Sequence, residues 1–303
     1  MNGAVNFLKP PGMTSSDAVV WLRWVLGTKK CGHGGTLDPA ACGVLPVLVG
    51  SGTKLFDRML AHQKTYAATI RFGKATDTLD AQGRVLAETD ALPDDAALRA
   101  AMRRFTGQIE QTPPQYSAVR IGGRHAYALA RSGAAVDMPT RRVTIDALEG
   151  PVWLDEKTAT IRVRCSAGTY IRTLAADLAA ACGSLGHLCA LTREKSGDFA
   201  ICDALCVEEL LAMKEAGRIA EAVVPVAHLL RDLPALTLHD AACRRACNGA
   251  KLCADDVCGD VQAGREYRVF APDGTLVGVF AADAGGLFVR TMLYAPHAAE
   301  KKA

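Results

Sequence analysis

The sequence predicts a mixed fold of helices and strands that is divided into one large and one small domain. Its 303 residues, half of them apolar, exceed the usual size of one domain and can bury a sizeable core. Apolar residues recur at helical spacing in some segments and alternate with polar residues in others. We place the domain boundary near residues 231–234, which gives domains 1–232 and 233–303.

The first hundred or so residues contain three regular patterns. Residues 15–26 have the apolar spacing of an amphipathic helix, which Ser15 or Ser16 would cap. Residues 64–72 alternate between apolar and polar positions and predict a strand. Residues 95–105 predict a second helix with one apolar face.

Residues 112–142 interrupt this regular pattern. They are rich in glycine, proline and arginine, with tyrosines interspersed. Long irregular segments of this kind are typically either functional or disordered, and we interpret this one as functional.

Regular patterns resume near residue 160. Residues 160–166 predict a strand, and a helix begins after Gly168-Thr169-Tyr170-Ile171-Arg172. Arg172 therefore lies at a strand-to-helix junction, from which its side chain can reach into a cleft. In the small domain we expect a short helix capped by Asp240 and a hairpin whose turn contains Asp273-Gly274.

The net charge of +3 is unevenly distributed. Residues 1–75 have nine Lys/Arg against three Asp, a charge of +6, and residues 118–142 have five Arg against one Asp, a charge of +4. Such an excess suits a phosphate backbone, although a solvated protein surface explains it equally well. Residues 233–295 have six basic and seven acidic residues, which limits RNA contact by the small domain to a small patch.

Membrane and secreted proteins are disfavoured. The N-terminal segment MNGAVNFLKPPGMTSS lacks the basic and apolar regions of a secretory signal. No segment approaches the roughly 18 apolar residues of a membrane span. We therefore expect a cytoplasmic protein without membrane contact, and a monomer, because the sequence implies no protein partner.

The cysteines do not predict a metal site. There are eleven, an odd number, which in a cytoplasmic chain favours reduced thiols that behave as small hydrophobic residues. Cys243, Cys247, Cys253 and Cys258 lack the paired C-x2-C spacing of zinc ribbons. We expect no structural metal.

The most informative segment is Gly32-His33-Gly34-Gly35-Thr36-Leu37-Asp38-Pro39. Its glycines allow turns and close approach to a ligand, and Pro39 fixes its own φ angle. Asp38, the only carboxylate of this loop, therefore lies on a shaped turn between apolar segments. A single acid on a turn is usually a cap or an Asx-turn, which is the alternative to a chemical role.

The whole motif resembles the catalytic loop of the TruB-type tRNA pseudouridine synthases. Other long segments resemble the same family and follow in the same order, which is more specific than one short pattern. They are Lys9–Ser15, Lys64–Tyr66, Thr76–Gly83, Gln111–Ala118 and Gly168–Arg172. The last segment of the chain resembles a PUA domain, a small RNA-binding β-barrel.

The resemblance implies an α+β fold, with a large mixed, mostly antiparallel sheet flanked by helices and a small β-barrel-like PUA domain. It implies conversion of uridine 55 in the T-loop of tRNA to pseudouridine, with residues 112–142 as the insertion that grips the RNA. The uridine must be flipped out of the folded loop. Because the reaction involves neither redox chemistry nor hydrolysis, we expect neither a metal nor an organic cofactor.

The resemblance also assigns the central residues. Asp38 would attack the ribose or stabilise positive charge at C1′, and Arg172 would keep it ionised. Tyr66 would stack on the target base and help to remove the C5 proton. Its apolar surroundings fit a core tyrosine as well, and the two roles are compatible.

Five more residues receive substrate-binding roles from the resemblance. Tyr170 and Leu191 would form walls of the base pocket, although a leucine in an apolar run is normally core. His33 would hold the rearranged RNA loop, although a histidine in a glycine-rich turn can be incidental. Lys54 follows Gly50-Ser51-Gly52-Thr53, which suggests a phosphate contact. The stretch does not complete a nucleotide-binding P-loop, which disfavours binding of a nucleoside triphosphate. Asp80 would touch the substrate. Asp77 and Asp80 could together bind a magnesium ion, but we favour the interpretation that they form local hydrogen bonds.

Two other functions remain open. A non-catalytic RNA-binding or RNA-folding protein could use the same scaffold, but the joint presence of Asp38, Tyr66 and Arg172 speaks against it. A synthase that acts on guide-selected RNA within a larger particle is the second alternative. The long basic insertion favours a stand-alone enzyme.

Overall fold

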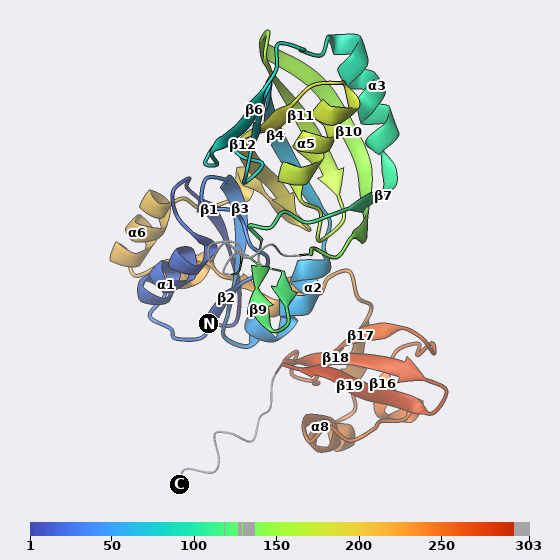
Figure 1. The fold of residues 1–303 in the computed structure, drawn as a ribbon. Coiled ribbons are helices and arrows are strands. Elements are labelled where there is room, and N and C mark those ends of the chain that lie inside the picture. The colour runs from blue at the N-terminus through green and yellow to red at the C-terminus, as the bar shows by residue number, and fades with distance from the viewer. Residues whose placement is uncertain (118, 127–128, 130–136, 294–303) are drawn as a thin grey trace.

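The computed structural model describes residues 1–117, 119–126, 129 and 137–293 (Figure 1). A ten-stranded sheet flanked by helices is followed by a five-stranded sheet, here called the large sheet and the small sheet. The α+β prediction is therefore confirmed. No helix within the described ranges is both long and apolar enough to cross a bilayer.

The large sheet is mixed and mostly antiparallel, as predicted. Its main path runs β14-β1-β3-β12-β4-β11-β10-β7, with β2 paired to β3 and β13 paired to β12. Only the pairing of β12 with β3 is parallel within the described part of this sheet. The strands are β1 Gly3–Lys9, β2 Cys31–His33, β3 Cys42–Val49, β4 Lys64–Phe72, β7 Gly107–Gln111, β10 Arg141–Asp155, β11 Thr158–Cys165, β12 Gly186–Ser196, β13 Phe199–Ala200 and β14 Val224–Pro225.

Helices pack on the large sheet and close its core. The predictions for residues 64–72 and 95–105 are confirmed, since β4 and α3 have these bounds. The strand predicted at 160–166 begins earlier, at Thr158, and ends at Cys165. The helical segments are α1 Ser15–Val25, α2 Phe56–Ala61, α3 Asp95–Phe105, α5 Ile171–Ala181, α6 Val207–Glu215 and α7 Val226–Leu229, with 3-10 turns η1 Gly50–Leu55, η2 Ile201–Asp203 and η3 Ile219–Ala222.

The cap predicted for the first helix is wrong by one residue. Thr14, not Ser15 or Ser16, caps α1: its hydroxyl accepts the Asp17 amide, and the Asp17 carboxylate accepts the Thr14 amide. Ser15 is the first helical residue, and its buried hydroxyl bonds instead to the backbone of Leu37.

Residues 112–142 are less irregular than predicted. Strands β8 Arg120–Ile121 and β9 Arg124–His125 form a short hairpin, and β10 begins at Arg141. Residues 118, 127–128 and 130–136 of this segment lie outside the described residues. A second small hairpin, of β5 Lys74–Thr76 and β6 Val85–Glu88, carries the loop that contains Asp80.

The small sheet has its own apolar core and the strand order β16-β15-β17-β18-β19. The predicted hairpin is confirmed, because β17 and β18 are antiparallel and Asp273 accepts the Thr275 amide in the turn. The predicted cap at Asp240 is wrong: His239 is the cap residue, and Asp240 opens the helix. The elements are β15 Ala235–Leu238, α8 Asp240–Cys247, η4 Ala254–Asp256, β16 Val257–Cys258, β17 Glu266–Phe270, β18 Leu276–Asp283 and β19 Gly286–Met292.

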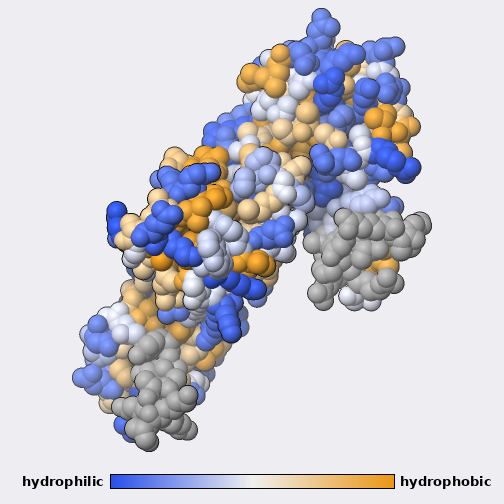
Figure 2. Space-filling view, turned by 90° about the vertical axis from the view of Figure 1, so that its left-hand side faces the viewer, coloured by the Kyte–Doolittle hydropathy of each residue, from blue (hydrophilic) through white to orange (hydrophobic). Residues whose placement is uncertain are grey.

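The small sheet packs against the region of α2 and η1 (Figure 1). Met59, Leu230 and Val279 belong to one apolar cluster that joins the two parts of the molecule. Arg58 adds polar contacts with Asp232, at 3.2 Å, and with Glu266. Figure 2 shows the resulting elongated shape and a surface on which hydrophilic and hydrophobic residues are mixed.

Candidate active site

Asp38 lies on a loop between β2 and β3 whose backbone is held at several points. The Gly34 amide donates to the Pro46 carbonyl at 2.7 Å. The Ser15 hydroxyl donates to the Leu37 carbonyl at 2.9 Å and accepts the Leu37 amide at 2.8 Å. The Asp38 side chain itself is 38% exposed, so a rigid loop presents its carboxylate at the surface of the site.

The far end of the loop is held by a buried cation. Lys9 is 0% exposed, and its ammonium donates to the carbonyls of Pro10, Met13 and Pro39. The Gly12 amide also donates to the Pro39 carbonyl, at 2.8 Å. The residue that follows Asp38 is therefore fixed by two donors.

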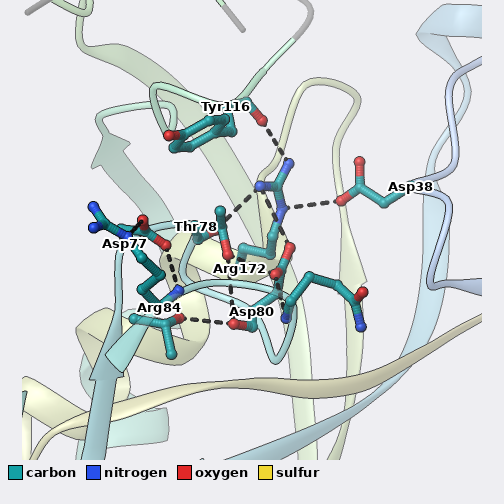
Figure 3. Close-up of polar contacts among 9 residues, drawn as sticks. Asp38, Asp77, Thr78, Asp80, Arg84, Tyr116 and Arg172 are labelled. Atoms are coloured by element: carbon teal, nitrogen blue, oxygen red, sulfur yellow. Dashed lines mark hydrogen bonds and ion pairs between the residues drawn. The ribbon is translucent and has the colours of Figure 1, made fainter. Parts of the chain in front are cut away.

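Arg172 connects Asp38 with a second carboxylate. It is the second residue of α5, at the strand-to-helix junction that the sequence predicts, and it is 6% exposed. Its Nε lies 2.9 Å from Oδ2 of Asp38, and its Nη1 lies 3.7 Å from Oδ2 of Asp80 (Figure 3). The guanidinium therefore bridges the two carboxylates.

Backbone carbonyls hold the same guanidinium from other directions. Nη1 of Arg172 donates to the Thr78 carbonyl at 3.1 Å, and Nη2 donates to the Tyr116 carbonyl at 3.0 Å (Figure 3). The arginine therefore connects the Asp38 loop, the Asp80 loop and the start of the segment 112–142. Its position is fixed before any substrate arrives.

Tyr170 is held beside Arg172 by a buried amide. Gln111 of β7 is 1% exposed; its Oε1 accepts the Tyr170 amide at 2.8 Å and its Nε2 donates to the Tyr170 carbonyl at 3.0 Å. The half-buried Tyr170 ring lies 5.4 Å from the Arg141 guanidinium. This clamp positions the N-terminus of α5 and thereby Arg172.

The acids of the Asp80 loop form local hydrogen bonds, which is the arrangement we preferred for them. Oδ1 of Asp80 accepts the Thr78 hydroxyl at 2.6 Å and the Gln82 amide at 3.0 Å. Asp77 accepts the Arg84 amide at 2.8 Å and pairs with its guanidinium at 3.3 Å. Within the described ranges no group of three or more His, Cys, Asp and Glu side chains is arranged to hold a metal ion.

Tyr66 is both a core residue and a neighbour of the site. It is 9% exposed and belongs to the main apolar core. Burial raises the pKa of its hydroxyl, the charge of Arg193 opposes this, and the charge of Asp38 adds to it. The phenol is therefore protonated at neutral pH and lies within electrostatic reach of Asp38. Leu191, half-buried on β12, packs against the same core.

His33 and Lys54 lie outside the Asp38–Arg172–Asp80 cluster. His33 is half-buried at the end of β2, and its Nδ1 has no hydrogen-bond partner among the described residues. Burial, followed by the charge of Arg193, lowers the pKa of this imidazole, so it is neutral at pH 7. Lys54 is exposed in η1 and donates to the Met292 carbonyl of the small sheet at 2.6 Å. No phosphate is needed to explain its position.

Several residues that build the site were not predicted from the sequence. Thr78, Gln111 and Tyr116 lie in segments that resemble the family, but their roles depend on long-range contacts. Arg193 stands in the run Arg193-Glu194-Lys195, which is typical of a solvated face, yet it is 1% exposed. One signal was available: residues two apart in a strand share a face, so Arg193 lies on the face of Leu191.

Comparisons with known proteins show which family this chain belongs to. A family model described as TruB family pseudouridylate synthase (N terminal domain) matches residues 23–171. The tRNA pseudouridine synthase B of Bacillus pumilus is 37% identical over 286 residues, 92% of this chain and 93% of that protein. The protein of the same name from Streptococcus pneumoniae is 46% identical over 225 residues, 72% of this chain and 77% of that protein.

Solved structures show the same fold. A chain in a Cbf5–Nop10–Gar1 complex is 25% identical, with a TM-score of 0.74 over 96% of this chain and 85% of that one. The sequence relatives match at well above 30% identity over most of their length. They confirm the resemblance on which the sequence-based predictions depend. The chain belongs to the TruB family of pseudouridylate synthases.

Proposed function

We propose that this chain converts uridine 55 in the T-loop of tRNA to pseudouridine, with Asp38 as the nucleophile. Relatives named tRNA pseudouridine synthase B, which match most of the chain, support the reaction and the substrate. The observation that carries the proposal for the site is the 2.9 Å pair of a partly exposed Asp38 with a buried Arg172. In this pair the Asp38 carboxylate stays partly exposed on a rigid loop.

The reaction needs a group that acts at the ribose. The N1–C1′ bond breaks, the uracil turns, and C5 joins C1′; the proton lost from C5 is balanced by the proton gained at N1. The Asp38 carboxylate attacks C1′ or stabilises the positive charge that develops there, as glycosidase carboxylates do. Because the base is never reduced, oxidised or hydrolysed, the amino acids of the site suffice.

The other residues would bind the flipped uridine. Tyr66 packs against the uracil from the core side, as a protonated phenol, and Tyr170 and Leu191 line the pocket. Asp80 would touch the substrate and would also anchor Arg172, whose Nη1 lies 3.7 Å from its Oδ2. His33 contacts the RNA as a neutral imidazole.

The RNA would be held at two further places. Residues 112–142 grip the T-stem-loop, and the Arg172 contact to the Tyr116 carbonyl links this segment to the site. Residues 233–303 would serve as a PUA-like domain, with Lys54 contacting a phosphate near the junction with the small sheet. Although the Cbf5 chain was solved with Nop10 and Gar1, we propose that this chain acts as a monomer on bare tRNA in the cytoplasm.

The test uses the isolated chain and a T-stem-loop that is tritiated at C5 of uridine 55. Turnover replaces the C5 hydrogen, so an active synthase releases tritium into water, whereas a non-catalytic RNA-binding protein releases none. The control RNA has its label on another uridine of the stem. RNA binding without tritium release, or equal release from the control RNA, would refute the proposed reaction or its position.

A further inference from the structure

A second buried arginine contacts the loop that carries Asp38 and has no part in the proposed chemistry. Arg193 of β12 is 1% exposed and is the largest fully buried side chain in the described part of the molecule. No carboxylate of the described residues lies within 4.0 Å of its guanidinium. Because burying a charge is costly, an arginine without an acidic partner is expected only where other groups hold it.

Backbone carbonyls hold this guanidinium, and two of them belong to the Asp38 loop. Nε of Arg193 donates to the Val44 carbonyl at 2.6 Å. Nη1 donates to the Thr36 carbonyl at 3.1 Å, and Nη2 donates to the Gly35 carbonyl at 3.3 Å. A planar guanidinium offers donors in a fixed fork, so it fixes the carbonyls relative to one another. The loop segment just before Asp38 is thereby tied to β3.

The backbone of Arg193 is itself fixed in the middle of the large sheet. It pairs with Gly43 of β3 in the parallel register and with Tyr66 of β4 in the antiparallel register. Gly43 has φ +107, and a Cβ there would lie 2.3 Å from the Arg193 carbonyl oxygen. This close approach, which only glycine allows, brings the Arg193 backbone directly against β3.

The charge of Arg193 also acts on the walls of the site. After burial, it is the next cause that lowers the pKa of His33 and the pKa of Lys64. At Tyr66 it opposes the rise in pKa that burial causes. One guanidinium therefore influences the loop before Asp38, the imidazole at the loop entrance and the phenol across the strand pair.

We propose that Arg193 is a positioning residue for this reaction. It holds Gly35 and Thr36 so that the Asp38 carboxylate meets both Arg172 and the ribose, with Tyr66 fixed on the neighbouring strand. Arg193 touches neither Asp38 nor the reacting atoms, and its effect is transmitted through the loop backbone. The inference rests on the proposed function, because it assumes that Asp38 must be placed accurately.

The test compares Arg193→Met and Arg193→Lys with the wild type, using tritium release and RNA affinity. A positioning role predicts that Arg193→Met lowers kcat by about a hundredfold, as misplacement of a reacting group by about 1 Å does, while RNA affinity stays nearly unchanged. Arg193→Lys recovers part of kcat, because an ammonium keeps the charge but cannot serve three carbonyls of a fixed fork. Arg71→Met, at an exposed arginine of the neighbouring β4, serves as the control.

The fraction of folded protein is measured by circular dichroism at the assay temperature, and kcat is expressed per folded molecule. Wild-type kcat in Arg193→Met, or a loss that disappears after this correction, would overturn the positioning role. A loss of RNA affinity that matches the loss of kcat would overturn it as well. If the wild type and Arg71→Met release no tritium, the proposed function fails instead, so the two failures are distinguishable.

Discussion

The large sheet and the small sheet differ in the charges that they bury. Among the described residues, the buried lysines and arginines are Lys9, Lys64, Arg172 and Arg193, and all belong to the large sheet or to α5 upon it. Among residues 233–293 the one buried charged side chain is Asp256 of η4, which pairs with Arg245. Lys9, Arg172 and Arg193 contact the loop that carries Asp38, whereas Lys64 donates to carbonyls at the end of α2. Because a buried charge destabilises a fold, three such charges around one loop indicate that chemistry, not stability, decides these residues.

The small sheet should therefore respond to substitutions as an ordinary apolar core. Phe280 of β18 is 0% exposed, so Phe280→Ala should lower the free energy of unfolding by about 3–5 kcal/mol. Urea unfolding measures this loss. Folded Phe280→Ala should keep its kcat, because the small sheet does not carry Asp38. Its KM for tRNA should rise, because we propose that this part of the chain helps to hold the RNA. A reduced kcat with unchanged KM would contradict the separation of the two parts.

The cluster around Arg172 should respond in the opposite way. Arg172→Met removes the cation shared by Asp38 and Asp80, and we expect kcat to fall by about 100- to 1000-fold. Arg162→Met is the matched control, since Arg162 is half-exposed and pairs with Glu194 at 2.6 Å on the same sheet. Exposed ion pairs contribute less than about 1 kcal/mol to the free energy of unfolding, so Arg162→Met should have nearly the stability and kcat of the wild type. Similar kinetics of both variants would contradict the special role of Arg172.

The energetic cost of burying a charge should make the free energy of unfolding depend on pH. Burial lowers the pKa of Lys64 to about 8 from 10.5. Between these values the unfolded chain binds one more proton than the folded protein, so this residue makes the free energy of unfolding rise with pH, by up to about 3 kcal/mol. The measurement is urea unfolding from pH 7.5 to 10.5 in the wild type and in Lys64→Met. Identical slopes in the two proteins would contradict the lowered pKa of Lys64 in the folded protein.

Lys54 at the junction of the two parts provides the smallest expected effect. Its bond to the Met292 carbonyl is exposed, so Lys54→Met should change the free energy of unfolding by less than about 1 kcal/mol. If Lys54 also contacts a phosphate, Lys54→Met should reduce the slope of log K for RNA binding against log salt concentration by about 0.7 to 0.9 in magnitude. Titrations at several salt concentrations measure this slope. An unchanged slope would leave Lys54 as a contact between the two parts and nothing more.

The sequence was sufficient to predict those elements that depend on a pattern of neighbouring residues. The strand at residues 64–72, the helix at 95–105 and the placement of Arg172 at the start of α5 follow from periodicity over a few residues. The turn that carries Asp38 follows from its glycines and proline. The chemical roles of Asp38, Arg172 and Tyr66 could not be predicted from a local pattern and came from the resemblance to the TruB-type family.

The sequence was insufficient where a distant partner decides between local alternatives. Thr14 and Ser15 can both cap a helix, and the contact of Ser15 with Leu37 decides in favour of Thr14. Arg193 belongs to a charged run, and only its bond to the Val44 carbonyl, 149 positions away, shows that it is buried. The contact between Lys54 and Met292 joins residues that are 238 positions apart.

The most direct test of the central claim is single-turnover tritium release by Asp38→Asn at saturating enzyme, where RNA affinity no longer limits the rate. Asp57→Asn, at an exposed acid of α2, is the control. We expect that Asp38→Asn binds the T-stem-loop but releases no tritium, while Asp57→Asn reacts at the wild-type rate. A wild-type rate of release by Asp38→Asn would contradict this expectation.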